Sequence, residues 1–218
     1  MPESGDGVIE LIAVMDRLRS PGGCPWDARQ THHSLVEYLL EEAYETVEAI
    51  ESGTRDDLRE ELGDLLLQVV FHSRIAQEDP ASPWNIDDVA RDISAKLIRR
   101  HPHVFGEQSG DVTTAEQVES QWHELKAREK GRDSVTEGIP EALPALLRAG
   151  KVRARSDRLE VALPDTDAPL PEVADEEALG DLLLGIVASA RDRGWDAEAA
   201  LRAAVRRQVQ RIRDAEGV

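Results

Sequence analysis

Two acidic motifs, Glu41-Glu42-x-x-Glu45 and Glu61-x-x-Asp64, lie on consecutive stretches that have helical periodicity. The turn between the stretches, Gly53-Thr54-Arg55, is short, so an antiparallel helical hairpin is expected, with the motifs opposite one another. Carboxylates that face an apolar interior need a counter-charge, because burying one unpaired costs several kcal/mol. The motifs therefore restrict the chain to a helical bundle that gathers five acidic side chains around a cation.

The second stretch, residues 56–77, is predicted to be a buried helix. One broad apolar arc of this helix is formed by Leu62, Leu65, Leu66, Val69 and Val70. Most of the opposite side is covered by Leu67, Phe71 and Ile75. Glu61, Asp64 and Gln68 share one narrow wedge of this helix, and His72 lies one turn further on. Alternatively, Glu61 and Asp64 are residues near the helix N-terminus that the helix dipole favours.

The first stretch, residues 34–52, is predicted to be an ordinary amphipathic helix with Glu42 near the edge of its apolar face. Alone, its acidic run would be typical of a solvated surface. Opposite the second helix, its carboxylates suit a hard cation with oxygen ligands, Mg²⁺ first and Mn²⁺ second. The single cysteine, Cys24, and the lack of Cys/His spacing give no support to a zinc site.

The composition favours an all-α protein. Helix-forming residues dominate and alternating strand-like runs are missing from the 218 residues. One cysteine argues against a secreted disulfide scaffold, and without a signal or membrane-spanning pattern a cytoplasmic location without membrane contact is expected. The net charge of −18 disfavours nucleic-acid polymers and requires clustered cations for any phosphorylated ligand.

Two regions around the carboxylate helices could contact a ligand. The Gly/Pro-rich loop at residues 21–32 carries Trp26, either at a ligand-facing lip or as a plug in the core. A helix over residues 88–100, capped by Asp87, would turn Val89, Ile93 and Leu97 to the core. The basic residues near its end could complement the helix dipole or bind phosphate; they are Lys96, Arg99, Arg100 and His101.

A further helix is predicted from Thr113 or Thr114 to Lys130. Lys126 and Lys130 project from it together, to pair with acidic residues or to reach a phosphate. The whole sequence is thus expected to divide into three parts: a catalytic helical domain at residues 1–135, a connector with a Pro/Asp-rich loop at 136–175, and a degenerate second segment at 176–218. That segment repeats part of the Glu61 motif as Ala178-Leu179-Gly180-Asp181, with Ala178 in the place of the glutamate.

Over about residues 11–155 the chain resembles the MazG nucleoside triphosphate pyrophosphohydrolases. The two carboxylate motifs are shared with the wider all-α superfamily of nucleoside triphosphate pyrophosphohydrolases. More specific to MazG proteins are the segments Cys24-Pro25-Trp26-Asp27 and Arg100-His101-Pro102-His103-Val104-Phe105. Gln30-Thr31-His32 and the stretch from Lys126 to Lys130 also belong to the resemblance.

The resemblance implies a MazG-type helical bundle that hydrolyses a nucleoside triphosphate to the monophosphate and pyrophosphate with Mg²⁺, by attack of metal-activated water at the α-phosphorus. By the same analogy Glu42, Glu45, Glu61 and Asp64 bind metal, and Glu41 is a ligand or orients the water. Candidate substrate contacts are Lys96, Arg99, Arg100, Lys126, Lys130 and Trp26. A homodimer is expected because family members usually dimerise through these helices.

Two alternatives remain open from the sequence. One is a sister enzyme with a narrower substrate, a dUTP or phosphoribosyl-ATP pyrophosphohydrolase. The other is a non-enzymatic acidic helical protein that binds a protein partner.

Overall fold

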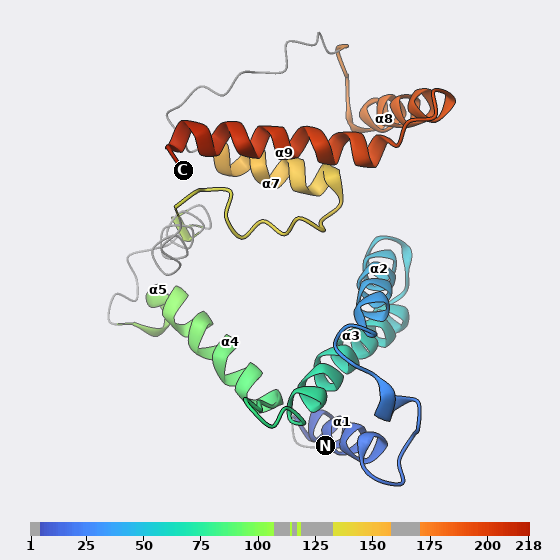
Figure 1. Ribbon diagram of the computed structural model, residues 1–218, viewed down its shortest axis with the longest axis vertical. Coiled ribbons are helices and arrows are strands. Elements are labelled where there is room, and N and C mark those ends of the chain that lie inside the picture. The colour runs from blue at the N-terminus through green and yellow to red at the C-terminus, as the bar shows by residue number, and fades with distance from the viewer. Residues whose placement is uncertain (1–4, 107–113, 115–116, 119–132, 158–170) are drawn as a thin grey trace. The chain divides into compact units, whose positions relative to one another are not determined.

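The computed structural model describes residues 5–106, 114, 117–118, 133–157 and 171–218 (Figure 1). Across these ranges the secondary structure is helical and contains no strand, which confirms the predicted all-α class. None of the helices in the described ranges is long and apolar enough to cross a lipid bilayer. The chain divides into two compact units, Met1–Val118 and Glu119–Val218.

The first unit is built on a helical hairpin. Its elements are α1 (Asp6–Arg19), the 3₁₀ turn η1 (Asp27–Arg29), α2 (Val36–Ser52), α3 (Arg55–Ala76), α4 (Ile86–Arg100) and α5 (Pro102–Phe105). The helices α2 and α3 pack along one another, and α1 and α4 each contact α3. Only Gly53 and Thr54 separate α2 from α3, so the expected hairpin is present.

Capping boxes fix where α3 and α4 begin. Thr54 Oγ1 accepts from the Asp57 amide at 3.2 Å, and Asp57 Oδ2 accepts from the Thr54 amide at 2.7 Å. The second box pairs Asn85 with Asp88, so α4 starts at Ile86 and the prediction that Asp87 is its cap is wrong. Asp87 instead donates its own amide to Asn85 Oδ1 at 2.8 Å.

The core of the first unit lies toward the C-terminal half of α3. Its fully buried members are Met15, Leu35, Val70 and Phe71. The N-terminal half of α3 is different: Leu62 is 50% exposed and Leu66 is 37% exposed. The prediction of a buried α3 therefore holds for only part of the helix in the single chain.

The second unit contains α7 (Ala145–Ser156), α8 (Glu176–Asp192) and α9 (Ala197–Glu216). Its core is Ile139, Val152, Val205 and Ile212, and α7 packs along α9. The stretch expected to be a connector thus includes α7, because Pro144 precedes a helix here and Val152 enters the core. The degenerate second copy at residues 176–218 stays a prediction.

Candidate active site

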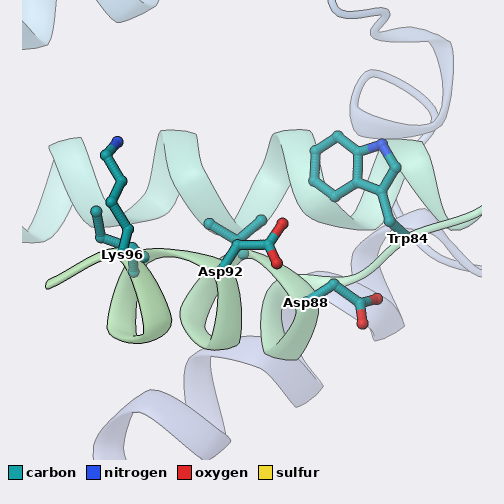
Figure 2. A pocket seen from close by; sticks show the side chains of 6 residues that line it. Trp84, Asp88, Asp92 and Lys96 are labelled. Carbon is teal, nitrogen blue, oxygen red and sulfur yellow. The ribbon is translucent and has the colours of Figure 1, made fainter. Parts of the chain in front are cut away.

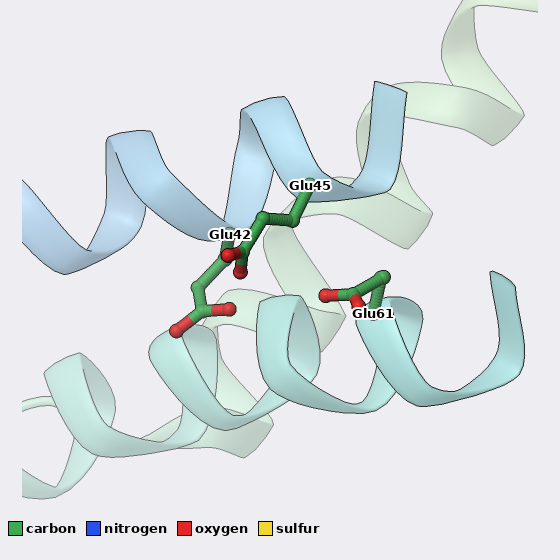
Figure 3. A group of neighbouring side chains, drawn as sticks. All are labelled: Glu42, Glu45 and Glu61. Atoms are coloured by element: carbon green, nitrogen blue, oxygen red, sulfur yellow. The ribbon is translucent and has the colours of Figure 1, made fainter. Parts of the chain in front are cut away.

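Three of the predicted metal ligands meet where α2 faces α3. Glu42 and Glu45 project from α2 and Glu61 projects from α3 (Figure 3). One carboxylate oxygen from each lies within 4.8 Å of the others. Glu45 and Glu61 are therefore neighbours in the fold although they lie 16 residues apart in the sequence. We call Glu42, Glu45 and Glu61 the carboxylate triad.

The tight connection between the helices sets this geometry. A Cβ atom on Gly53 would lie 2.8 Å from both the Cα and the carbonyl oxygen of Ala49, so only glycine fits there. Gly53 also donates its amide to the Ala49 carbonyl at 3.1 Å, which closes α2. The chain then enters α3 at once, so Glu61 in the second turn of α3 lies close to Glu42 and Glu45 near the middle of α2.

The triad is electrostatically strained. Desolvation raises the pKa of Glu42, and the charges of Asp64, Glu45, Glu41 and Glu61 raise it further. The pKa of Glu61 is also raised, first by desolvation at its part-buried position and then by Glu45 and Asp64. Within the described ranges no ion pair includes a triad residue, so this repulsion has no basic side chain to offset it.

Asp64 and Glu41 lie at the edge of the triad. Asp64 is part-buried on α3, and its negative charge acts on both Glu42 and Glu61. Glu41 is exposed on α2, and its charge acts on Glu42. The structure therefore gathers the five predicted acidic residues into one locality, with three of them close enough to share a cation.

The triad does not lie in the dry interior that the sequence predicts. Glu45 is exposed, and the apolar arc beside the triad is open as well, with Val69 40% exposed. Helical periodicity shows which side of a helix is apolar but does not show what covers it. In the single chain the site is a surface site with an uncovered apolar border.

The predicted substrate contacts are spread over several elements. Lys96 is part-buried on α4, where Arg99 is exposed and Arg100 is buried at the end of the helix. Trp26 is 45% exposed and meets the Tyr38 ring edge-on at 5.8 Å, so it does not plug the core. The predicted contacts Lys126 and Lys130 lie outside the described residues, as does most of the helix expected to carry them. At the predicted start of that helix, Thr114 Oγ1 accepts from the Gln117 amide at 3.3 Å.

The sequence did not predict that the rings of His32, His72 and Trp84 would lie together. The rings of His32 and His72 stack at 5.1 Å with an interplanar angle of 1°, and their Nδ1 atoms lie 2.8 Å apart in a hydrogen bond. Trp84 stacks near His32, with ring centroids 6.4 Å apart. The pKa of His72 is lowered, first by burial and then by His32. Forty residues separate the two histidines, so helical periodicity alone could not have paired them.

Comparison with known proteins gives consistent matches. The model of the MazG nucleotide pyrophosphohydrolase domain matches residues 30–105. The chain is 40% identical over 232 residues to the Thermotoga maritima protein named nucleoside triphosphate pyrophosphohydrolase/pyrophosphatase MazG, covering 99% of this chain and 88% of that protein. It is 38% identical over 234 residues to the nucleoside triphosphate pyrophosphohydrolase of Escherichia coli K12, covering 97% and 88%. An uncharacterised Streptomyces cacaoi protein is 48% identical over 214 residues, covering 98% and 84%.

Proposed function

The chain belongs to the MazG family of nucleoside triphosphate pyrophosphohydrolases, and from this we propose that it hydrolyses a nucleoside triphosphate to the monophosphate and pyrophosphate. The observation that carries the proposal is the carboxylate triad, whose ligand atoms lie within 4.8 Å of one another. Three carboxylates that converge without an ion pair in the described residues repel one another, and a bound cation would offset that repulsion.

The donor set of the triad fits a hard divalent cation. Carboxylate oxygens are the ligands that Mg²⁺ and Mn²⁺ prefer. Desolvation and neighbouring carboxylates raise the pKa values of Glu42 and Glu61, and a bound cation would offset both effects. Glu42, Glu45 and Glu61 would hold the ion, with Asp64 as a further ligand and Glu41 as a ligand or as the residue that orients water. When bound, the cation would offset the charge of the triphosphate and lower the pKa of water.

The proposed reaction is an in-line displacement that needs no covalent nucleophile. Water attacks the α-phosphorus and pyrophosphate leaves, so negative charge grows on the leaving group. Lys96, Arg99, Arg100, Lys126 and Lys130 are the proposed contacts for that charge, and Trp26 is a further proposed substrate contact. The acidic surface makes these cations necessary, because a charge of −18 repels a free triphosphate.

We also propose that the protein is a homodimer joined through the hairpin. Helices α2 and α3 expose apolar side chains that a single chain leaves in water: Leu40, Tyr44, Val47, Ile50, Leu62, Leu66 and Val69. A second copy would cover this face and remove water from the border of the triad, in line with the principle that large apolar patches mark interaction sites.

Product analysis tests the proposed function. The full chain is incubated with each common nucleoside triphosphate, with dUTP and with phosphoribosyl-ATP, in Mg²⁺ or in EDTA. Release of monophosphate and pyrophosphate in Mg²⁺ alone is expected. Turnover confined to dUTP or to phosphoribosyl-ATP would replace the proposal with a narrower enzyme, and no turnover of any compound would refute it.

A further inference from the structure

Two contacts hold the connection between α1 and α2 against α3 and the segment that follows it. Arg19 donates to two backbone carbonyls of the turn at residues 27–30 and pairs with Glu78 at 2.7 Å. Further along the chain, His32 forms a hydrogen bond with His72 of α3, with 2.8 Å between the two Nδ1 atoms. Arginine stays charged at any ordinary pH, whereas histidine titrates near neutrality, so only the second contact is sensitive to protons in the physiological range.

The histidine contact can exist only while one ring keeps a free lone pair at Nδ1. A neutral imidazole donates from one ring nitrogen and accepts at the other, whereas an imidazolium ring only donates. The pair can therefore take up one additional proton and keep its hydrogen bond. A second additional proton would leave two donors 2.8 Å apart and two positive rings stacked at 5.1 Å, so it breaks the contact.

The environment of the pair opposes this second proton. Within the described residues, His72 Nε2 is buried and lacks a hydrogen-bond partner, so a proton added there finds no acceptor. Burial lowers the pKa of His72, and His32 lowers it further. His32 is exposed and takes up the first additional proton, because water can solvate its charge. The contact is therefore stable at neutral pH and is lost as the pH falls through the lowered pKa of His72.

The charged groups around the pair belong to other interactions. Those that line the hollow of about 460 Å³ beside His32 are Arg19, Arg29, Glu78 and Asp79. Glu78 is bound to Arg19 at 2.7 Å and to Arg74 at 2.9 Å, and Asp79 Oδ1 accepts from the Ala81 amide at 2.9 Å. The hydrogen bond from Arg19 holds the pKa of Glu78 below its ordinary value. Glu78 thus stays charged while the histidines titrate, so the Arg19 contact persists when the histidine contact is lost.

Open space beside the rings lets them part without disturbing the core. Trp84 stacks near His32, with ring centroids 6.4 Å apart, and is 40% exposed. The indole also lines a hollow of about 510 Å³ along α4, which Figure 2 shows with Trp84 and Lys96 at opposite ends. Ile93, which the sequence assigned to the core, is 43% exposed and lines the same hollow. Trp84 therefore borders two open hollows and can move when His32 moves.

We propose that the His32–His72 contact is a proton-operated latch between helix α3 and the connection that enters α2. The latch is closed while at most one ring is charged, and it opens when both rings are charged. Opening releases residues 31–34 from α3 while the Arg19 contact stays closed. Because α2 supplies two members of the carboxylate triad, acidification loosens the start of the helix that carries them. The latch operates whether or not the protein has the proposed catalytic activity.

Histidine NMR of the full chain tests the hydrogen bond directly. Nitrogen–proton correlation spectra distinguish a protonated ring nitrogen from an unprotonated one. At about pH 7, one of the two Nδ1 atoms of His32 and His72 should be protonated and the other should not, and below the pKa of both rings both should be protonated. Two rings that both carry their proton on Nε2 at neutral pH would exclude the hydrogen bond and overturn the proposal.

Amide hydrogen exchange as a function of pH tests the opening. The Leu35 amide donates to the Thr31 carbonyl at 3.2 Å and reports on the latch, whereas the Gln30 amide donates to the Asp27 carbonyl at 3.2 Å and reports on the turn that Arg19 holds. The protection factor corrects for the intrinsic effect of pH on exchange. From about pH 7 to about pH 5, the protection factor of Leu35 should fall at least about tenfold while that of Gln30 is kept.

Matched substitutions separate the latch from a general loosening. His32→Phe keeps a flat ring against His72 but removes the hydrogen bond, so Leu35 should exchange at neutral pH as fast as in acidified wild type and respond no further to acid. His33→Phe alters the exposed neighbouring histidine and should behave as wild type. A constant Leu35 protection factor in wild type overturns the proposal, as does a pH response that survives in His32→Phe. A parallel fall at Gln30 also overturns it, because the whole connection would then be unfolding.

Discussion

At the scale of single residues, the proposed chemistry depends on carboxylates that repel one another. The pKa values of Glu42 and Glu61 are both raised, first by desolvation and then by the charges of their acidic neighbours. The sequence indicated these residues because acidic side chains fell next to apolar arcs at helical spacing. It could not show that Glu42, Glu45 and Glu61 would come closest, because that depends on the register of α2 against α3.

The raised pKa values predict how the metal-free protein responds to pH. A carboxyl whose pKa is raised on folding holds its proton more tightly in the folded state, so stability falls as pH rises from the ordinary value of 4.5 through the raised pKa. We expect the free energy of unfolding in EDTA to decline over this range. Urea denaturation at a series of pH values measures it, and Glu42→Gln should flatten the decline. A profile in Glu42→Gln that matches wild type would contradict the prediction.

The lowered pKa of His72 predicts the opposite dependence of stability on pH, in a different pH range. Its pKa is lowered from 6.5, so the folded state favours the neutral ring, and the stability it contributes is lost as pH falls from 6.5 through the lowered pKa. His72→Gln should remove this loss, as measured by thermal unfolding between pH 7 and 5. The exposed neighbour of the pair, His33, provides the control, since His33→Gln should keep the wild-type profile.

At the scale of helices, sequence patterns predicted which helices exist better than where each helix begins and ends. The periodicity predicted α2, α3 and α4 within a few residues of their observed bounds. Asp87 was chosen as the cap of α4 because aspartate favours that position, but Asn85 and Asp88 form the reciprocal pair. The helix α7 was missed because its residues were assigned to the connector, whereas Pro144 stands immediately before the first turn of a helix.

The cap assignment makes a direct stability prediction. Asn85→Ala removes the side chain that accepts from two amides of α4, and should lower the free energy of unfolding by about 1 kcal/mol. Asp87→Ala should cost only a few tenths of a kcal/mol, since Asp87 contributes through the helix dipole. Equilibrium denaturation of both variants measures the difference, and an equal or reversed order would rule out Asn85 as the cap.

At the scale of the whole molecule, the proposed homodimer would join assembly to catalysis through the uncovered apolar surface of α2 and α3. The sequence showed that these helices are rich in apolar residues, and the single chain buries only part of them. Periodicity shows which side of a helix is apolar but not what covers it, and the dry cleft expected around the triad was not found within one chain. In the proposed homodimer, a second copy over this face would exclude water from the site.

The dimer proposal predicts the effect of one charge on that face. Ile50 is 65% exposed on α2, and Ile50→Glu should convert the dimer to a monomer because a carboxylate would be buried at the interface. Light scattering coupled to gel filtration measures the mass. Leu184 on α8 is 69% exposed in the second unit, so Leu184→Glu serves as the matched control and should leave the dimer intact. A wild-type mass for Ile50→Glu would place the interface elsewhere.

Cation binding at the triad is the claim on which the enzymatic account depends, and calorimetric titration with Mn²⁺ tests it most directly. Wild type should bind Mn²⁺, Glu61→Gln should bind it at least about tenfold more weakly, and Glu48→Gln, which alters the same acidic helix outside the triad, should bind like wild type. If Glu61→Gln binds Mn²⁺ as tightly as wild type, or if Glu48→Gln weakens binding equally, the carboxylate triad is not the metal site.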